Sequence, residues 1–304
     1  MRFRKPIGLF LCGGGALGSW QSGVLSVLVN AGIEFDIVAG FSIGSVNGAA
    51  YCFGRTSGLK EAWGSVSREK ILRPKIAYNN IPLELVRLNF GSFLWKLGLK
   101  VNSLLSKITL FSGDAVYDFL SDWIITEDPA FKKRAIFYII SHCVERKLPY
   151  ITRFDKTTHS KNISFVDAIA ASCAIPMIFP PVKIRENGNI VHLVDGGIIG
   201  MATINLNMFE GCGTIIIISN SFDGDLNHPV NGPLSYFESN ARRILAIHVH
   251  EIYNSRMLLR SKPDVHLIKP PGTLGLSLLD FDGQKCVRAF EVGEEEGKKW
   301  NSYF

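Results

Sequence analysis

Ser42 is the first candidate for chemistry, because it lies in a G-x-S-x-G pentapeptide that runs from Gly40 to Gly44. An apolar run at residues 37–39 precedes the pentapeptide, and a helix-like stretch at residues 45–51 follows it. A serine on a sharp strand-to-helix turn has strained backbone angles, and glycine on both sides removes Cβ atoms that would clash. The pattern therefore makes Ser42 a candidate nucleophile, with a glycine-rich turn of no chemical significance as the alternative.

A serine hydroxyl is a weak nucleophile unless a base takes its proton, and histidine is the usual base. The seven histidines offer no obvious candidate. His248 and His250 are two residues apart on an expected helix, so they face different ways and do not form a metal-binding pair. His192 precedes Asp195 by three residues on one expected strand and would point to the opposite face, which favours a structural role for this histidine.

Asp195 is a better candidate for the base. It ends an apolar strand, and Gly196 and Gly197 follow it and permit a tight turn. A carboxylate at the carboxyl end of this strand would point toward the same edge of the sheet as Ser42. The alternative is that Asp-Gly forms an ordinary hairpin turn.

A glycine-rich loop follows the first apolar run, residues 7–12, and has the spacing Gly13-x-Gly15-x-x-Gly18. This spacing matches the dinucleotide-binding fingerprint, which also needs an acidic residue at the end of the second strand. Asp36 lies before that strand, at its wrong end, so the dinucleotide hypothesis loses most of its support. The same loop can serve as a cradle of backbone N–H groups for an oxyanion.

The expected elements around these motifs indicate an α/β fold. A strand at residues 7–12, a helix at 19–31 and a strand at 37–40 form a β-α-β crossover that places the glycine loop and Ser42 at the carboxyl ends of parallel strands. Further strands are expected at 135–143, 150–154, 190–194, 214–218 and 265–268, and further helices at 115–125, 168–174, 233–259 and 284–299. Without an internal repeat or linker, one domain over residues 1–304 is the simplest organisation.

The composition indicates a globular protein of the cytoplasm. Of 304 residues 47% are hydrophobic, and no apolar stretch reaches the roughly 18 residues that span a bilayer. The apolar run near the start is short and ends in three glycines, which favours a buried strand over a signal peptide. Six scattered cysteines without a C-x-x-C pair favour reduced thiols over a disulfide-bonded or zinc-binding protein.

The net charge of +6 is concentrated in one segment. Between Arg68 and Lys107 there are eight basic residues and two acidic ones, a surplus of +6 that equals that of the whole chain. The simpler interpretation of residues 94–108 is a helix packed on the core with its lysines in water, and the alternative is a lid that faces a membrane or the substrate. The local surplus favours an anionic partner surface.

Taken in order, the motifs resemble those of the patatin-like phospholipase family. The resemblance rests on the loop 13–18, the pentapeptide 40–44 and the sequence Asp195-Gly-Gly, and a stretch at 171–181 is also similar. It covers residues from about 7 to about 209. One departure is Leu17, where many members of the family carry a basic residue.

The resemblance implies a three-layer α/β/α sandwich with a mostly parallel sheet. It places the catalytic core at about 7–209, a basic apolar helical insertion at about 68–111, and a C-terminal portion at about 210–304.

The resemblance also implies a lipid acyl hydrolase with a Ser42–Asp195 dyad, no metal and no cofactor. The expected oxyanion and substrate-binding residues are Gly13, Gly14, Gly15, Gly18 and Ile43. A lipid or other acyl ester would be the substrate, the basic segment 68–107 would contact an anionic membrane, and no nucleic acid would bind. The alternatives are a dinucleotide-binding protein and a catalytically silent membrane-interaction module.

Overall fold

The computed structural model describes residues 3–73, 109, 111–123, 135–156, 162–197, 205–227 and 233–302. The basic insertion expected at 68–111 lies largely outside the described residues. Its function as a lid, a membrane contact or a dimer interface therefore stays a prediction.

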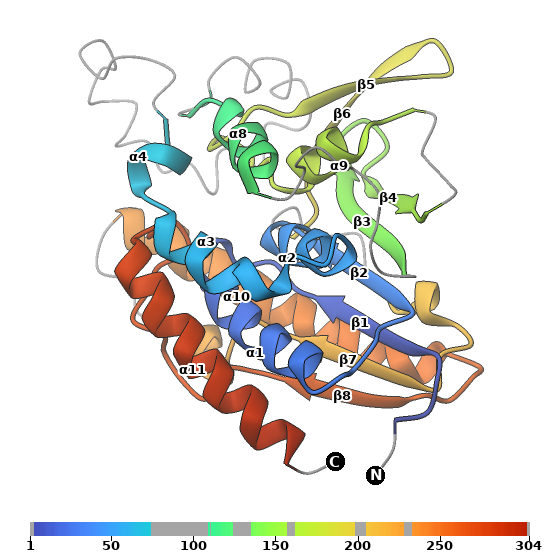
Figure 1. The fold of residues 1–304 in the computed structure, drawn as a ribbon. Helices are drawn as coiled ribbons and strands as arrows, with labels where there is room; N and C mark the ends of the chain where they lie inside the picture. The colour runs from blue at the N-terminus through green and yellow to red at the C-terminus, as the bar shows by residue number, and fades with distance from the viewer. Residues whose placement is uncertain are drawn as a thin grey trace.

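The centre of the fold is an eight-stranded sheet (Figure 1) with the order β5-β6-β3-β2-β1-β7-β8, in which β4 also pairs with β3. The pairs β1–β2, β2–β3, β1–β7 and β7–β8 are parallel, so the expectation of a mostly parallel sheet is confirmed. The strands are β1 (Ile7–Leu11), β2 (Ile37–Phe41), β3 (Ile136–Cys143), β4 (Leu148–Phe154), β5 (Val182–Glu186), β6 (Asn189–Asp195), β7 (Thr214–Ile218) and β8 (Asp264–Ile268).

Helices cover both faces of the sheet, as expected for a three-layer sandwich. Helices α1, α2, α3 and α11 pack together on one face, and α10 lies against the other (Figure 1). The helices are α1 (Gly18–Asn30), α2 (Ile43–Cys52), α3 (Leu59–Ser65), α4 (Arg68–Ile71), α8 (Asp114–Trp123), α9 (Phe165–Ser172), α10 (Pro233–Asn254) and α11 (Gly283–Asn301). Helix α10 ends at Asn254, earlier than the expected residue 259, and a short 3₁₀ turn, Ser255–Leu258, follows it.

The apolar runs that predicted strands become the middle of the sheet. Every residue of β1 and of β7 is buried, because helices cover both faces of these two strands. Helix α9 begins as its sequence suggests, since the side chain of Ser164 accepts a hydrogen bond from the backbone N–H of Asp167. These local signals locate the elements to within a few residues.

The strand that carries Asp195 runs against the main direction of the sheet. Strand β6 is antiparallel to β3 and forms a hairpin with β5, a strand that the sequence did not suggest. In the register on β3, Phe41 at the end of β2 lies opposite Ile140, and Asp195 at the end of β6 lies opposite Ser141. The carboxyl ends of β2 and β6 therefore meet end to end beside β3. The expected meeting of Asp195 and Ser42 thus arises from an antiparallel strand and not from a shared edge of parallel strands.

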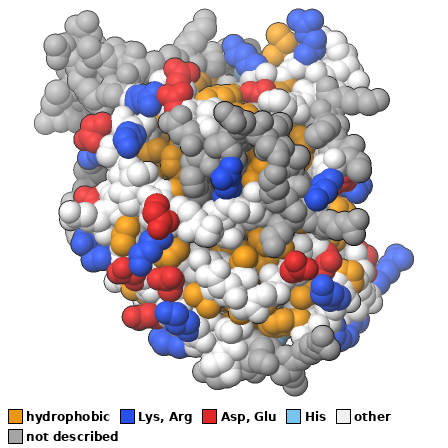
Figure 2. Space-filling model, viewed as in Figure 1, with side chains coloured by type: hydrophobic (Ala, Val, Ile, Leu, Met, Phe, Trp, Pro, Cys, Tyr) orange, Lys and Arg blue, Asp and Glu red, His pale blue; other side chains and the backbone are white. Residues whose placement is uncertain are grey.

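The surface over α3 and α11 mixes charges of both signs (Figure 2). Lys60 of α3 pairs with Glu291 and Glu294 of α11, at 3.0 and 3.6 Å. Near the start of the basic segment, Arg73 pairs with Asp118 of α8. Among the described helices, none has the length and the apolar character that crossing a bilayer requires.

Candidate active site

Ser42 occupies the turn between β2 and α2 in a conformation that side-chain-bearing residues rarely adopt. Its φ is 51° and its ψ is −134°, and it is the N-cap of α2. A Cβ on Gly40 would lie 2.6 Å from the backbone of Gly44, and a Cβ on Gly44 would lie 2.1 Å from the carbonyl oxygen of Leu11. Both contacts are too short for any other residue, so the two glycines let the strand and the helix approach closely enough to force the turn.

The end of α9 holds the backbone on both sides of the site. The N–H of Ser42 donates to Ser172 Oγ at 2.9 Å, and that hydroxyl donates to the carbonyl of Ile140 at 2.6 Å. The N–H of Asp195 donates to the carbonyl of Ala174 at 2.9 Å. Sequence reasoning did not identify Ser172 as a site residue. Two signals pointed to its surroundings: the run of small residues at 168–174, which suggested a helix that lies close to the site, and the family-like stretch at 171–181, which includes Ser172.

Asp195 is fully buried, and within the described part of the chain only one of its two carboxylate oxygens accepts a hydrogen bond of regular geometry. Its Oδ1 accepts the N–H of Gly197 at 2.7 Å. Burial raises the pKa of Asp195 to about 7, because desolvation outweighs the hydrogen bonds from the Ser42 hydroxyl and from Gly197 N–H, which lower it.

The Ser42 hydroxyl and the Asp195 carboxyl group are neighbours without a hydrogen bond of regular geometry between Oδ2 and any described residue. The hydroxyl is nevertheless close enough to lower the pKa of the carboxyl group. Both observations fit a hydroxyl that lies near the carboxylate without being aligned with it. Such loose pairs are common in catalytic sites before a substrate binds.

The glycine loop lies directly beside Ser42. A Cβ on Gly13 would lie 3.0 Å from Ser42 Cβ. The backbone N–H groups of Gly13, Gly14 and Gly15, and that of Ile43 at the start of α2, donate no hydrogen bond to any described residue. Gly13, Gly14 and Ile43 are buried and Gly15 is partly buried, and N–H groups without an acceptor are rare in the interior of a protein. These four groups are therefore available to bind a negatively charged oxygen atom.

The ring of Phe41, which lies within the pentapeptide 40–44, packs against both the glycine loop 13–18 and the Asp195-Gly-Gly turn. An added Cβ would lie 2.6 Å from this ring at Gly13 and 2.3 Å from it at Gly197. Gly196 is packed against the backbone of Ile140. In the same way Gly18, the first residue of α1, is packed against the side chain of Ile43, where a Cβ would lie 2.4 Å away. The structure thus gathers the site residues named from the sequence around Ser42.

Two cavities adjoin the candidate site. A small apolar cavity of about 60 Å³ is lined by Ser42, Gly15 and Ile43 together with large apolar side chains such as Trp63 and Phe281. A larger cavity of about 540 Å³ has a mixed lining, and it shares Val116, Cys173 and Phe179 with the first. The lining of the small cavity is almost wholly apolar, whereas that of the large one includes Asp167, Lys183 and the hydroxyl of Tyr117.

The acidic residue considered for dinucleotide binding, Asp36, and the histidine considered as a base, His192, are engaged in other contacts. The carboxylate of Asp36 accepts the N–H of Ile7 at 2.7 Å, so it lies at the start of β1, at the other end of the sheet from the glycine loop. His192 pairs with Glu145, with 2.7 Å between Nδ1 and Oε1. Within the described residues, no group of His, Cys, Asp and Glu side chains is arranged to hold a metal ion.

A family model for patatin-like phospholipases matches residues 9–206, which include the glycine loop, Ser42 and Asp195. The chain belongs to this family. The uncharacterised protein YqhO of Bacillus subtilis is 27% identical over 197 residues, which are 62% of this chain and 62% of YqhO. The lysophospholipase NTE1 of Phaeosphaeria nodorum is 26% identical over 97% of this chain, which spans only 18% of that protein.

Among solved structures, VipD from Legionella pneumophila is similar to this chain with a TM-score of 0.47 and 14% sequence identity. The alignment covers 98% of this chain and 67% of VipD.

Proposed function

We propose that this chain is a serine lipid acyl hydrolase that cleaves carboxylic esters with Ser42 as nucleophile and Asp195 as base. The observation that carries the proposal is the pairing of a strained, helix-capping serine with a fully buried aspartate whose pKa is about 7. A carboxylate with a pKa near the working pH is well matched to accept and return a proton. Membership of the patatin-like phospholipase family supports the same reaction.

In the proposed reaction, Ser42 Oγ attacks the ester carbonyl carbon while Asp195 takes the hydroxyl proton. The carbonyl oxygen becomes an oxyanion, which the N–H groups of Gly13, Gly14, Gly15 and Ile43 stabilise. The intermediate then collapses, the C–O bond to the alcohol breaks, and Asp195 returns the proton to the departing alkoxide. A water molecule, deprotonated by Asp195, then attacks the acyl-serine. The bond between the acyl carbon and Ser42 Oγ breaks, Asp195 returns the proton to Oγ, and the carboxylic acid is released.

The substrate class that we propose is a lipid with an acyl ester bond, such as a phospholipid or lysophospholipid. The apolar cavity beside Ser42 suits an acyl chain, and the name lysophospholipase of the fungal relative agrees with this class. In this view the larger cavity, which includes Lys183 and Tyr117, takes the polar part of the lipid.

The pH dependence of turnover follows from the raised pKa of Asp195. Protonated Asp195 cannot accept the hydroxyl proton, so kcat/KM is expected to rise with pH and to level off above a midpoint of about 7. The measurement is hydrolysis of p-nitrophenyl butyrate from about pH 5 to about pH 8, followed at the isosbestic wavelength of the product. A profile that is flat or falling over this range would argue against Asp195 as the base.

We also propose that the basic segment 68–107 binds an anionic membrane surface. Replacing Lys96 and Lys100 by glutamate should weaken binding to phosphatidylglycerol vesicles, measured by flotation, by about 30-fold or more, since each lysine near such a surface contributes about 1 kcal/mol and each added glutamate is repelled by it. Lys298→Glu on α11, which reverses one exposed charge elsewhere, is the control and should bind like the unaltered protein. Equal binding of the double variant, or equal binding to neutral vesicles, would contradict this part of the proposal.

A further inference from the structure

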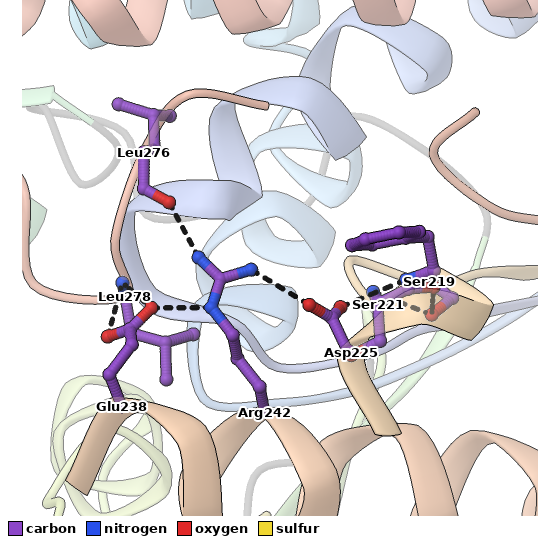
Figure 3. Close-up of polar contacts among 8 residues, drawn as sticks. Ser219, Ser221, Asp225, Glu238, Arg242, Leu276 and Leu278 are labelled. Atoms are coloured by element: carbon purple, nitrogen blue, oxygen red, sulfur yellow. Dashed lines mark hydrogen bonds and ion pairs between the residues drawn. The ribbon is translucent and has the colours of Figure 1, made fainter. Parts of the chain in front are cut away.

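Arg242 of α10 is a buried arginine that the family motifs do not include. It is 5% exposed, and its guanidinium group makes three contacts (Figure 3). Nε donates to Glu238 Oε1 at 2.6 Å, Nη1 to Asp225 Oδ1 at 3.1 Å, and Nη2 to the carbonyl oxygen of Leu276 at 2.6 Å. Burying charged groups costs free energy and by itself adds little stability. A buried cluster of this kind is therefore a candidate for positioning other parts of the structure.

One side of the cluster reaches the end of the glycine loop. Both carboxylate oxygens of Glu238 accept the N–H of Leu278 at 3.0 Å, which together with the Arg242–Leu276 bond fixes this short segment. The carbonyl of Leu278 in turn accepts the N–H of Ala16 at 2.9 Å. Gly15 is pressed against the same carbonyl with a φ of +53°, and a Cβ there would lie 2.1 Å from the oxygen atom.

The other side of the cluster reaches the start of the loop. Asp225, fully buried, accepts the N–H of Phe222 at 3.0 Å through Oδ2 and so closes the turn that follows β7. Ser219 and Ser221 brace this turn (Figure 3). The turn carries Asn220, whose Nδ2 donates to two carbonyl oxygens of the loop, that of Cys12 at 3.0 Å and that of Gly13 at 3.1 Å.

Holding these two carbonyls also sets the direction of two N–H groups. In a planar trans peptide the C=O of one residue and the N–H of the next point in opposite directions. With the carbonyl oxygens of Cys12 and Gly13 bound to Asn220, the N–H groups of Gly13 and Gly14 must point away from Asn220. These are two of the groups that lack an acceptor among the described residues.

We infer that Arg242 is a positioning residue for the oxyanion donors, acting through Asp225 and Asn220 at one end of the glycine loop and through Leu278 at the other. The inference rests on the proposed hydrolase function. It also assigns a function to the C-terminal portion of the chain, because the cluster lies beyond residue 206, where the match to the family model ends. That portion thereby completes the active site.

The test replaces Arg242 by lysine, which keeps the charge but cannot reach three acceptors at once. We expect kcat for p-nitrophenyl butyrate to fall about 10- to 100-fold while KM changes little, since displaced donors act on the transition state. The rate constant for fluorophosphonate labelling of Ser42 should fall in parallel, while the fraction of protein that can be labelled and the pH midpoint stay the same. Asn220→Ala, which removes both contacts to the loop directly, should show the same pattern and decides the test if the Lys variant does not fold.

Arg256→Lys is the matched control, because Arg256 follows α10, bonds to the carbonyl of Tyr253 and stacks on its ring. It should leave every rate within about twofold, as a surface change does. The inference would be overturned if both Arg242→Lys and Asn220→Ala had rates within twofold of the unaltered protein. It would also be overturned if the loss of activity came wholly from a smaller labelled fraction. Neither result would contradict the proposed hydrolase function. An unaltered protein that neither labels nor turns over would instead overturn the proposed function itself.

Discussion

Ser42→Ala is expected to lower ester turnover by about 10⁴-fold or more, because no acyl-enzyme can form without the hydroxyl. The change removes one oxygen atom and leaves the contacts of Gly40 and Gly44, which shape the turn, in place. Far-UV circular dichroism and the melting temperature should therefore stay close to those of the unaltered protein. The measurement is the steady-state hydrolysis of p-nitrophenyl butyrate.

Ser65→Ala on α3 is the control for this prediction, since Ser65 is exposed and its hydroxyl donates to the helix carbonyl of Ala62, far from the site motifs in the sequence. It should keep full turnover. A Ser42→Ala protein that retains more than a tenth of the unaltered activity would mean that another group is the nucleophile.

Asp195→Asn is expected to lower turnover by about 10³- to 10⁴-fold, because asparagine cannot accept the proton of Ser42. The amide keeps the size of the carboxyl group, and its oxygen can still accept the N–H of Gly197. The loss should therefore appear in kcat with the fold intact. An active Asn variant would remove Asp195 from the mechanism.

The same substitution has a second expected result, on stability. Burial raises the pKa of Asp195 from its ordinary value of 3.8 to about 7 in the folded protein, so the folded state binds the proton more tightly than the unfolded state. The stability that this proton contributes is present below about pH 4 and is lost as the pH rises through about 7. At about pH 8 the Asn variant should be more stable than the unaltered protein by a few kcal/mol, at most roughly 4.

Urea denaturation at two pH values measures this difference. The advantage of the Asn variant should shrink as the pH falls and should vanish near pH 4, where both proteins carry an uncharged group at this position. Equal stability of the two proteins at about pH 8 would show that the carboxylate is solvated and that its pKa is ordinary.

The parts of the fold that the sequence predicts are those with local causes. The strand–turn–helix around Ser42 follows from Gly40 and Gly44, which lie within five residues and contact each other. The start of α9 follows from Ser164, which caps the helix by accepting the N–H of Asp167, three residues further on. The parallel strands β1 and β7 follow from apolar runs that are buried on both faces. Each signal can be recognised in a short window of the chain.

The parts that the sequence does not predict depend on distant residues. Strand β6 carries Asp195 to Ser42 through antiparallel pairing with β3, and nothing in its own residues gives its direction. Ser172 binds the N–H of Ser42 across 130 positions, and Asn220 binds Cys12 across 208. A serine at the end of a helix or an asparagine after a strand has many alternative uses, so only the folded chain shows these two as supports of the site.

The most direct test of the central claim is to map the adduct of a fluorophosphonate by peptide mass spectrometry. We expect one adduct per chain, on Ser42, which forms at a rate that rises with pH through about 7 and is absent in Ser42→Ala. Ester turnover by a protein that carries no adduct on Ser42, or an adduct on another serine, would contradict the claim.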